Sequence, residues 1–353
     1  VLKYCYLTKI EVTSDNDITD TYTLDPTAET NTGALTGTGS GKQIILTTKG
    51  DYYGSTYPNG FPLTNTSANL ATNGAYMVIK PGTHTLRIRY WVKDVATQVE
   101  GTITKIIPSH TFAKNEYVNM EADLQIKNYD GDHYYMWDAQ EQYWKGYEWT
   151  QHLPGNTGQP TLNGNSSSNY AQSNADPRYY NASYPGNGVS NPATHTSCKD
   201  LPNANEMSWY CMYGDPRWDA DELWTTMGHL YKGGMWFKKK SVLQAENHYD
   251  TEKSADGTTD LRTTDKYYYT TSSSINNSGL PSAADAGNYF YLPALGYYYS
   301  GQLSGVGIQG VYWSSSATLW TSRNGDCINF SRSYVGVSDR NRNFGYRVEP
   351  AFE

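Results

Sequence analysis

The chain has 353 residues, a formal net charge of −8 and only 18% charged residues, with a mean hydropathy of −0.70. It is long enough for two domains and polar enough to be soluble. The negative charge argues against binding to nucleic acid or anionic membranes, since Lys238-Lys239-Lys240 is the single basic run. No apolar run reaches the roughly 18 residues of a transmembrane helix, so none is expected.

The composition is rich in residues that suit β-strands and aromatic surface loops. The chain contains 33 Tyr, 10 Trp and 32 Gly. Tyr favours strands and offers a large contact area with a polar tip. We therefore expect a β-rich, secreted binding protein. Because the chain opens directly on strand-like sequence, we expect any export signal to have been removed.

Residues 1–127 predict an all-β antiparallel sandwich. In the run 85–93, Leu86, Ile88 and Tyr90 fall on one face, while Arg87 and Arg89 point outward. Similar runs, separated by turn residues, bring the total to about seven strands. The other expected strands are 6–12, 22–24, 43–47, 75–79, 102–107 and 118–126.

Five motifs in this part carry a family resemblance. They are Leu7-Thr-Lys-Ile-Glu-Val-Thr-Ser14, Thr21-Tyr-Thr-Leu24, Ala75-Tyr-Met-Val-Ile-Lys-Pro-Gly82, Leu86-Arg-Ile-Arg-Tyr90 and Thr111-Phe-Ala-Lys-Asn-Glu-Tyr-Val-Asn119. Together they resemble a fimbrillin-like domain, the building block of Bacteroidetes pili. The resemblance covers one sandwich, whereas fimbrillins usually carry two, so the second is either replaced here or missing from the sequence. It implies other fimbrillin subunits as partners, joined by strand addition at an open sheet edge.

The sequence pattern changes at residue 128, where we expect a second domain, 128–353. Asp130 and Asp132 flank a glycine in a predicted linker turn, and they are also weak candidates for Ca²⁺ ligands. Residues 152–196 consist largely of Gly, Asn, Ser, Pro, Thr and Tyr, which predicts long surface loops. A second long loop is expected at 244–265.

Two helices are expected between these loops. Asn203 with Glu206 forms a capping-box pattern, and the helix should stop at Gly214. Asp219 with Glu222 repeats the start signal for a second helix that ends at Gly233-Gly234. A helix N-terminus also accounts for the acidic cluster of Asp215, Asp219, Asp221 and Glu222, which would otherwise suggest a sugar hydrolase.

Tyrosine-rich strands are expected at 267–270, 289–292 and 297–299. A triplet of tyrosines on a strand must place rings on both faces, so at least one ring of each triplet can reach solvent. Stacking of such rings on a ligand is possible, although packing in the core explains any single tyrosine as well. The ligand-binding candidates are Tyr267, Tyr269, Tyr297, Tyr298 and Tyr299.

The final stretch carries a second resemblance. Gly310-Val-Tyr-Trp-Ser-Ser-Ser316, the run Cys327-Ile-Asn-Phe330 and the segment 340–348 read as strands, with Phe344, Tyr346 and Val348 alternating against Gly345 and Arg347. They resemble the C-terminal half of the C-type-lectin-like domain of the Fibrobacter succinogenes major paralogous family. The resemblance implies an α+β domain with two helices and long loops. Its structural residues here are Trp313, Phe330, Tyr346 and Arg347.

No pattern for catalysis or a cofactor stands out. The seven His lack metal-site spacing, and Ser314–Ser316 lack a nucleophile elbow. Cys5, Cys198, Cys211 and Cys327 include no C-x-x-C pair, and bridges from Cys198 to Cys211 or to Cys327 are both open. We expect no enzyme activity and no cofactor.

The two resemblances together imply a non-enzymatic fimbrial subunit at the cell surface that mediates adhesion to a glycan or protein ligand. The chain ends at Glu353, a few residues past the closing strand, so we expect it to accept a strand but not to donate one, as a pilus-tip subunit would. Two alternatives are open. One is an enzyme of the formylglycine-generating type, which needs a reactive cysteine pair, and the other is a stand-alone surface carbohydrate-binding protein.

Overall fold

The computed structural model describes residues 5–20, 22–25, 34–37, 40–50, 58–63, 70–95, 98–182, 192–271, 274–276 and 280–349. The protein is mostly β, and the chain divides into two compact units. The first unit is Val1–Ile126 with Pro281–Gly287, and the second is Lys127–Leu280 with Asn288–Glu353. The fimbrillin-like and lectin-like identities expected for the two parts of the chain stay predictions.

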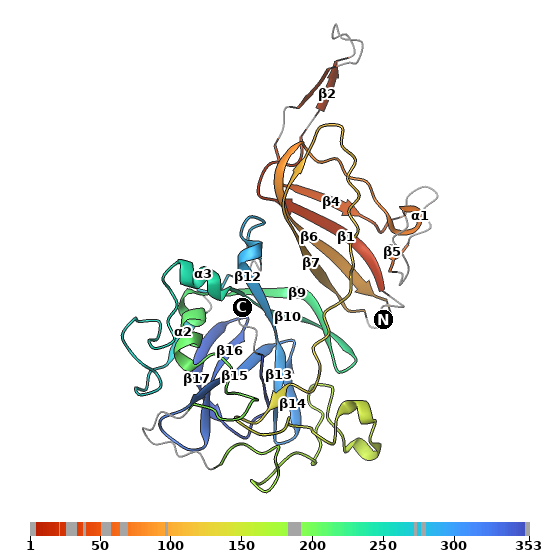
Figure 1. Cartoon of the computed structure of the whole chain (residues 1–353). Helices are drawn as coiled ribbons and strands as arrows, with labels where there is room; N and C mark the ends of the chain where they lie inside the picture. The colour runs from red at the N-terminus through yellow and green to blue at the C-terminus, as the bar shows by residue number, and fades with distance from the viewer. Residues whose placement is uncertain are drawn as a thin grey trace. The chain divides into compact units, whose positions relative to one another are not determined.

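The first unit is built on one antiparallel sheet. Its strand order is β4 (Gln43–Thr47), β1 (Cys5–Ser14), β6 (Gly82–Asp94), β7 (Glu100–Phe112), and β5 (Phe61–Pro62) also pairs with β1. The long strands of this sheet lie side by side in Figure 1. A separate ribbon pairs β2 (Tyr22–Asp25) with β3 (Ala34–Gly37), and α1 is one turn, Leu70–Asn73.

The alternation expected for residues 85–93 is confirmed on one face of β6. Leu86 and Ile88 are buried and pack with Val12 and Phe112 in the core of this unit. Arg89, expected to point outward, is instead buried and donates a hydrogen bond to Thr102 Oγ1 at 2.6 Å. The second face of the sheet is therefore also partly covered.

Two expected strands of this unit are wrong. Neither 75–79 nor 118–126 belongs to a strand, although both segments are described. Met77 and Ile79 still pack against the core. The alternation of apolar residues in this segment therefore reflects which side chains are buried, although the segment is not a strand. Val118 and Met120 are exposed. Alternation predicts which side chains share a face, but a strand also requires a neighbouring backbone.

The second unit contains the remaining elements. Its helices are η1 (Trp149–Gln151), η2 (Pro154–Asn156), α2 (Ala204–Tyr213) and α3 (Lys240–Ala245), while the sequence of η3 (Ala286–Asn288) is divided, with Ala286 and Gly287 in the first unit and Asn288 in the second. One sheet has the order β12 (Tyr289–Pro293), β10 (His229–Lys238), β9 (Arg217–Thr226). In the described residues, no helix is long and apolar enough to cross a membrane.

The largest sheet of the second unit forms its closing part (Figure 1). It runs β11 (Tyr268–Thr271), β17 (Tyr334–Asn341), β16 (Asn324–Ser331), β15 (Gln309–Ala317), β13 (Leu295–Tyr299), β14 (Gln302–Val306). The short strand β18 (Tyr346–Arg347) bridges β15 and β8 (Tyr134–Tyr135). The strands expected at 267–270, 289–292 and 297–299 are confirmed, whereas β14 and β17 were not predicted.

The first expected helix is confirmed as α2. Asn203 caps it, since its side chain accepts from the Glu206 N–H at 3.0 Å and the Glu206 carboxylate accepts from the Asn203 N–H at 2.8 Å. Gly214 is the C-cap. Local capping chemistry fixes both ends of this helix, which explains why its bounds could be read from the sequence.

The second expected helix is wrong, because residues 217–238 form the β9–β10 hairpin. Met227 and Gly228 link the strands with φ of 47° and 79°, and two positive values in a two-residue loop are typical of a type I′ hairpin turn. Leu223, Met227 and Leu230 match helical spacing, but β-branched Thr225 and Thr226 favour the strand. In the described residues after this hairpin, the α-helix is the short α3.

The capping pattern at Asp219 serves a strand irregularity instead of a helix. The Asp219 carboxylate accepts from the N–H groups of Asp221 and Glu222 at 3.0 and 3.3 Å, as it would at a helix start. The register shifts here, because Leu223 pairs with Lys232 but Asp219 pairs with Gly234. The acidic cluster thus lies at and around a bulge of β9, and the helix-dipole explanation for it is wrong.

Candidate functional site

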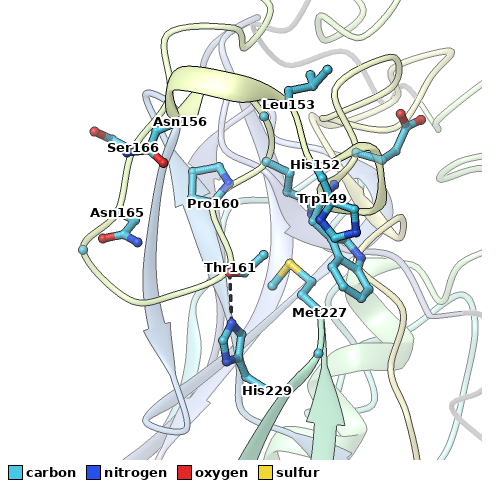
Figure 2. A pocket seen from close by; sticks show the side chains of 15 residues that line it. Trp149, His152, Leu153, Asn156, Pro160, Thr161, Asn165, Ser166, Met227 and His229 are labelled. Carbon is cyan, nitrogen blue, oxygen red and sulfur yellow. Dashed lines mark hydrogen bonds between the residues drawn. The ribbon is translucent and has the colours of Figure 1, made fainter.

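The second unit contains a cavity of about 680 Å³ that its irregular loops and the β9–β10 turn line together. One wall comes from residues 148–166, and the other from Met227, Gly228 and His229. Figure 2 shows Trp149 and His152 on one side and Asn165 and Ser166 on the other. The volume lies in the range of small-molecule sites in proteins.

Trp149 is held in this wall by contacts from three parts of the chain. Its backbone N–H donates to Gln159 Oε1 at 3.2 Å, and the amide of buried Gln159 in turn donates to Gly131 O and to Tyr298 Oη, at 2.7 and 3.2 Å. The Trp149 ring packs against the neighbouring aromatic core. The Trp149 backbone is therefore held through Gln159, and its half-buried indole is part of the cavity wall.

The β9–β10 turn fits closely against this ring. A Cβ placed on Gly228 would lie 3.3 Å from the Trp149 ring, and the positive φ of Gly228 also favours glycine. On the next residue, His229 Nε2 and Thr161 Oγ1 are 3.1 Å apart, which joins the turn to the loop. The two walls are thus tied together at the base of the cavity (Figure 2).

Strained backbone gathers around the cavity. Nine non-glycine residues of the described chain have positive φ, and three of them, His152, Asn156 and Met227, line this cavity. Such conformations cost about 1–3 kcal/mol each and concentrate at functional sites. Two of the three have a local explanation, since Met227 lies in the type I′ turn and His152 is the C-cap of η1.

The cavity has no basic side chain other than histidine. None of its lining residues is Lys or Arg. At its rim, burial acts to raise the pKa of Glu148, but hydrogen bonds from its own N–H, from the Gly146 N–H and from the Gln151 amide outweigh it and lower the pKa. Glu148 is thus ionised at neutral pH, which disfavours an anionic ligand.

The five tyrosine candidates lie elsewhere, on or next to β11 and β13. Tyr267, Tyr269 and Tyr299 are exposed, and Tyr297 is half-buried. Tyr298 is fully buried, and its hydroxyl donates to Pro160 O at 2.5 Å, so no ligand can reach its ring and its candidacy is wrong. Of the five, none lines the cavity.

The four residues expected to be structural are all in the core. Trp313 and Phe330 have no exposed surface, and Tyr346 packs against Trp313 with ring centroids 4.5 Å apart. Arg347, which the alternation placed on an open face, is 1% exposed, and it donates to Asp130 O and pairs with Glu349. Both faces of β18 are therefore buried. The ion pair with Glu349 takes the place of water around the Arg347 guanidinium.

Asp130 and Asp132 do come together with a third group. With His133 they offer ligand atoms that all lie within 4.8 Å of one another. Both acids are exposed, and Asp132 Oδ1 already lies 2.6 Å from His133 Nδ1. Two of these three groups, the carboxylates, are of the oxygen type that Ca²⁺ prefers, so Asp130 and Asp132 stay weak candidates.

The groups that could act as nucleophiles are enclosed. All four cysteines are free and buried, and burial, as the largest cause, raises the pKa of Cys198 and of Cys327 to about 12. Neither of the bridges left open by the sequence is formed. Ser314 and Ser316 are buried, and they bond within the fold, to Asp326 O and from the Ala204 N–H respectively.

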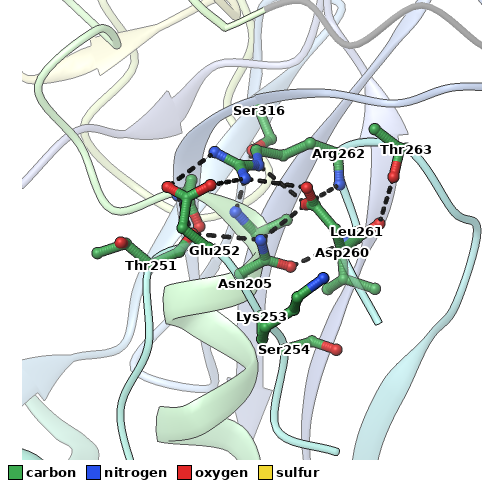
Figure 3. Close-up of polar contacts among 12 residues, drawn as sticks. Asn205, Thr251, Glu252, Lys253, Ser254, Asp260, Leu261, Arg262, Thr263 and Ser316 are labelled. Atoms are coloured by element: carbon green, nitrogen blue, oxygen red, sulfur yellow. Dashed lines mark hydrogen bonds and ion pairs between the residues drawn. The ribbon is translucent and has the colours of Figure 1, made fainter. Parts of the chain in front are cut away.

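The loop expected at 244–265 begins with the end of α3 and is held by a polar network (Figure 3). Asn205 on α2 is fully buried, donates to Asp260 Oδ1 at 2.9 Å and accepts from the Leu261 N–H at 2.8 Å. Arg262 pairs with both Asp260 and Glu252. The pKa of Asp260 falls to about 2, chiefly through the Arg262 hydrogen bond.

The other long loop, 152–196, is described to residue 182 and from residue 192 onward. It contains no strand and no α-helix in those ranges, as expected, but Ala171 and Arg178 are buried in it. Part of the loop is therefore packed rather than superficial.

Asp138 is an organising residue that the sequence did not reveal. It is fully buried with a φ of 55°. Its carboxylate accepts from the N–H groups of Thr194 and His195 at 2.9 and 2.7 Å, from Thr194 Oγ1 at 3.1 Å and from the Asn181 amide at 3.0 Å. It joins the loop end at 192–196 to the start of the second unit.

A carboxyl pair in the closing sheet predicts a pH-dependent stability. Asp326 on β16 stands directly opposite Asp339 on β17. Burial, then the charges of Asp339 and Asp265, raise the pKa of Asp326 to about 8, against a smaller effect of Arg342. The folded protein then binds a proton that the unfolded chain releases near pH 4.

Between about pH 4 and 8 this group should therefore lower the free energy of unfolding as pH rises, by at most about 1.4 kcal/mol per pH unit. Asp326→Asn mimics the protonated acid, so we expect it to remove this slope and to be more stable than wild type at pH 8. Urea unfolding of both proteins across this range measures the effect. Parallel pH profiles would contradict it.

Scans against protein-family models and searches of curated proteins and of solved structures found no match to this chain.

Proposed function

We propose that this protein is a non-enzymatic subunit of a cell-surface fimbrium, located at or near its tip, whose second unit mediates adhesion. The observation that carries the adhesive role is the cavity walled by residues 148–166 and the β9–β10 turn. It combines a fixed aromatic ring with polar side chains from two separate segments. The fimbrial part of the proposal rests on the sequence resemblance of residues 1–127 to fimbrillins.

An open sheet edge supports assembly by strand addition. Among the described residues, β4 pairs with β1 alone. Ile45 in the middle of β4 is exposed. A strand edge with free N–H and C=O groups can accept an extended segment of a partner subunit.

The buried thiols count against the formylglycine-generating alternative. That chemistry needs a reactive cysteine, and the thiolate is the reactive form. With the pKa of Cys198 and Cys327 near 12, both stay protonated at neutral pH. Asp219 belongs to the acidic cluster that would suggest a sugar hydrolase. Its carboxylate accepts hydrogen bonds from backbone N–H groups and from Trp236 Nε1, the latter at 3.2 Å.

The proposal is tested by adhesion and turnover measured on the same preparation. Beads coated with the full chain should adhere to bacterial or epithelial cells above the level of beads coated with heat-denatured chain. The protein should not oxidise a cysteine-containing peptide of the sulfatase type. Absence of adhesion, or peptide turnover that Cys327→Ser abolishes, would contradict the proposal.

A further inference from the structure

We propose that the cavity of the second unit binds a neutral pyranose sugar, with the Trp149 ring as the surface on which the sugar ring stacks. This inference rests on the proposed adhesive function and names the ligand class for it. Three properties of the cavity support this ligand class: its charge, its free polar groups and its rigidity.

The charge selects against acidic ligands. No Lys or Arg lines the cavity, and the ionised Glu148 stands at its rim. Phosphate, sulfate and carboxylate groups in proteins are usually held by Arg or Lys. Lys145, whose charge helps to lower the pKa of Glu148, lies outside the lining, so a nucleotide, a sulfated glycan or a sialylated glycan would meet no Lys or Arg within the cavity.

The free polar groups suit hydroxyls. The side chains of His152, Asn156 and Asn165 make no hydrogen bond within the part of the chain that the structure describes, and all three line the cavity. His229 uses Nε2 on Thr161. Amide and imidazole groups both donate and accept hydrogen bonds, which matches sugar hydroxyls that do the same.

The aromatic wall suits the apolar face of a pyranose ring. Trp149 is half-buried, and its backbone is fixed through Gln159. A rigid aromatic surface binds at a low entropic cost because little has to be ordered on binding. The other apolar side chains that line the cavity are Leu153, Pro160 and Met227 (Figure 2).

The test uses the full chain with four neutral probes, lactose, maltotriose, mannotriose and chitotriose, and with sialyllactose as an acidic probe. Binding is measured by isothermal titration calorimetry. We expect at least one neutral probe to bind and sialyllactose to bind more weakly than lactose. Trp149→Ala should weaken the binding about tenfold or more, and Asn165→Ala, which changes an exposed side chain, should weaken it a few-fold.

Trp320→Ala is the matched control, since Trp320 is exposed and lies outside the cavity. It should bind the probe as the wild type does, and circular dichroism spectra should show all three variants folded. Failure of every neutral probe to bind, or binding that both Trp149→Ala and Asn165→Ala leave unchanged, would overturn the inference. Absence of bead adhesion by the wild-type chain overturns the proposed function. Adhesion that persists in Trp149→Ala and is not inhibited by any of the four sugars overturns this inference alone.

Discussion

Replacement of Trp313 by alanine is expected to destabilise the second unit by about 3–5 kcal/mol. Trp313 is fully buried on β15, its ring packs against Tyr346, and its Nε1–H donates to Tyr135 O at 2.8 Å. The substitution leaves a cavity and removes the hydrogen bond to Tyr135 O at once. Urea unfolding followed by near-ultraviolet circular dichroism measures the loss on the transition of the second unit.

Trp320→Ala again provides the control, because Trp320 is 59% exposed. It should change stability by less than about 0.5 kcal/mol. A loss below about 1 kcal/mol for Trp313→Ala would show that the ring is not part of a packed core, and the arrangement of the closing sheet would then be wrong.

Replacement of Asp138 by alanine is expected to cost a similar amount, about 3–5 kcal/mol. The substitution removes a fully buried carboxylate that accepts four hydrogen bonds from residues 181–195, and with it the contacts that hold this loop end in place. It also places alanine at a φ of 55°, which asparagine and aspartate tolerate better. Thermal unfolding monitored by fluorescence gives the change in midpoint.

Asp200→Ala is a suitable comparison for Asp138, since Asp200 is exposed and has no side-chain hydrogen bond in the described residues. It should unfold like the wild type. The unfolding midpoint of Asp138→Asn should lie between those of Asp138→Ala and Asp200→Ala, because the amide keeps one acceptor and asparagine tolerates the same φ. Equal midpoints for Asp138→Ala and Asp200→Ala would disprove the organising role of Asp138.

The parts of the fold that could be predicted from the sequence are those that local chemistry decides. The capping box of Asn203 and Glu206 fixes α2, and strict alternation marks β6. Spacing alone misled at Leu223, Met227 and Leu230, where the same positions satisfy a helix and a hairpin. The Met227-Gly228 turn decides between them through its two positive φ values.

The candidate site could not be predicted, because it depends on contacts between residues far apart in the chain. Trp149 and Gly228 meet only when the β9–β10 hairpin forms beside the 148–166 segment. Because helical spacing predicts a helix here, the sequence does not indicate that Met227 and Gly228 form a turn that lines a cavity. Asn205 and Asp138 act through burial and long-range partners, and neither belongs to a sequence motif.

The tyrosines of β13 also show what alternation can predict and what it cannot. Alternation correctly separates Tyr297 and Tyr299 from Tyr298 on β13, and the buried ring is the middle one. It cannot tell which of the two faces meets solvent. Tyr299 lies beside Phe344, with ring centroids 4.7 Å apart, in an aromatic surface that is separate from the cavity.

The central claim, that the cavity beside Trp149 is the ligand site, is tested most directly by the indole N–H signals of the ten tryptophans in a two-dimensional ¹H–¹⁵N spectrum. Trp149→Ala identifies the Trp149 signal by its absence. On addition of the neutral sugar that binds best, the Trp149 signal should shift while those of buried Trp313 and exposed Trp320 stay in place. A sugar that binds without moving the Trp149 signal, or that moves only the Trp320 signal, would contradict this account.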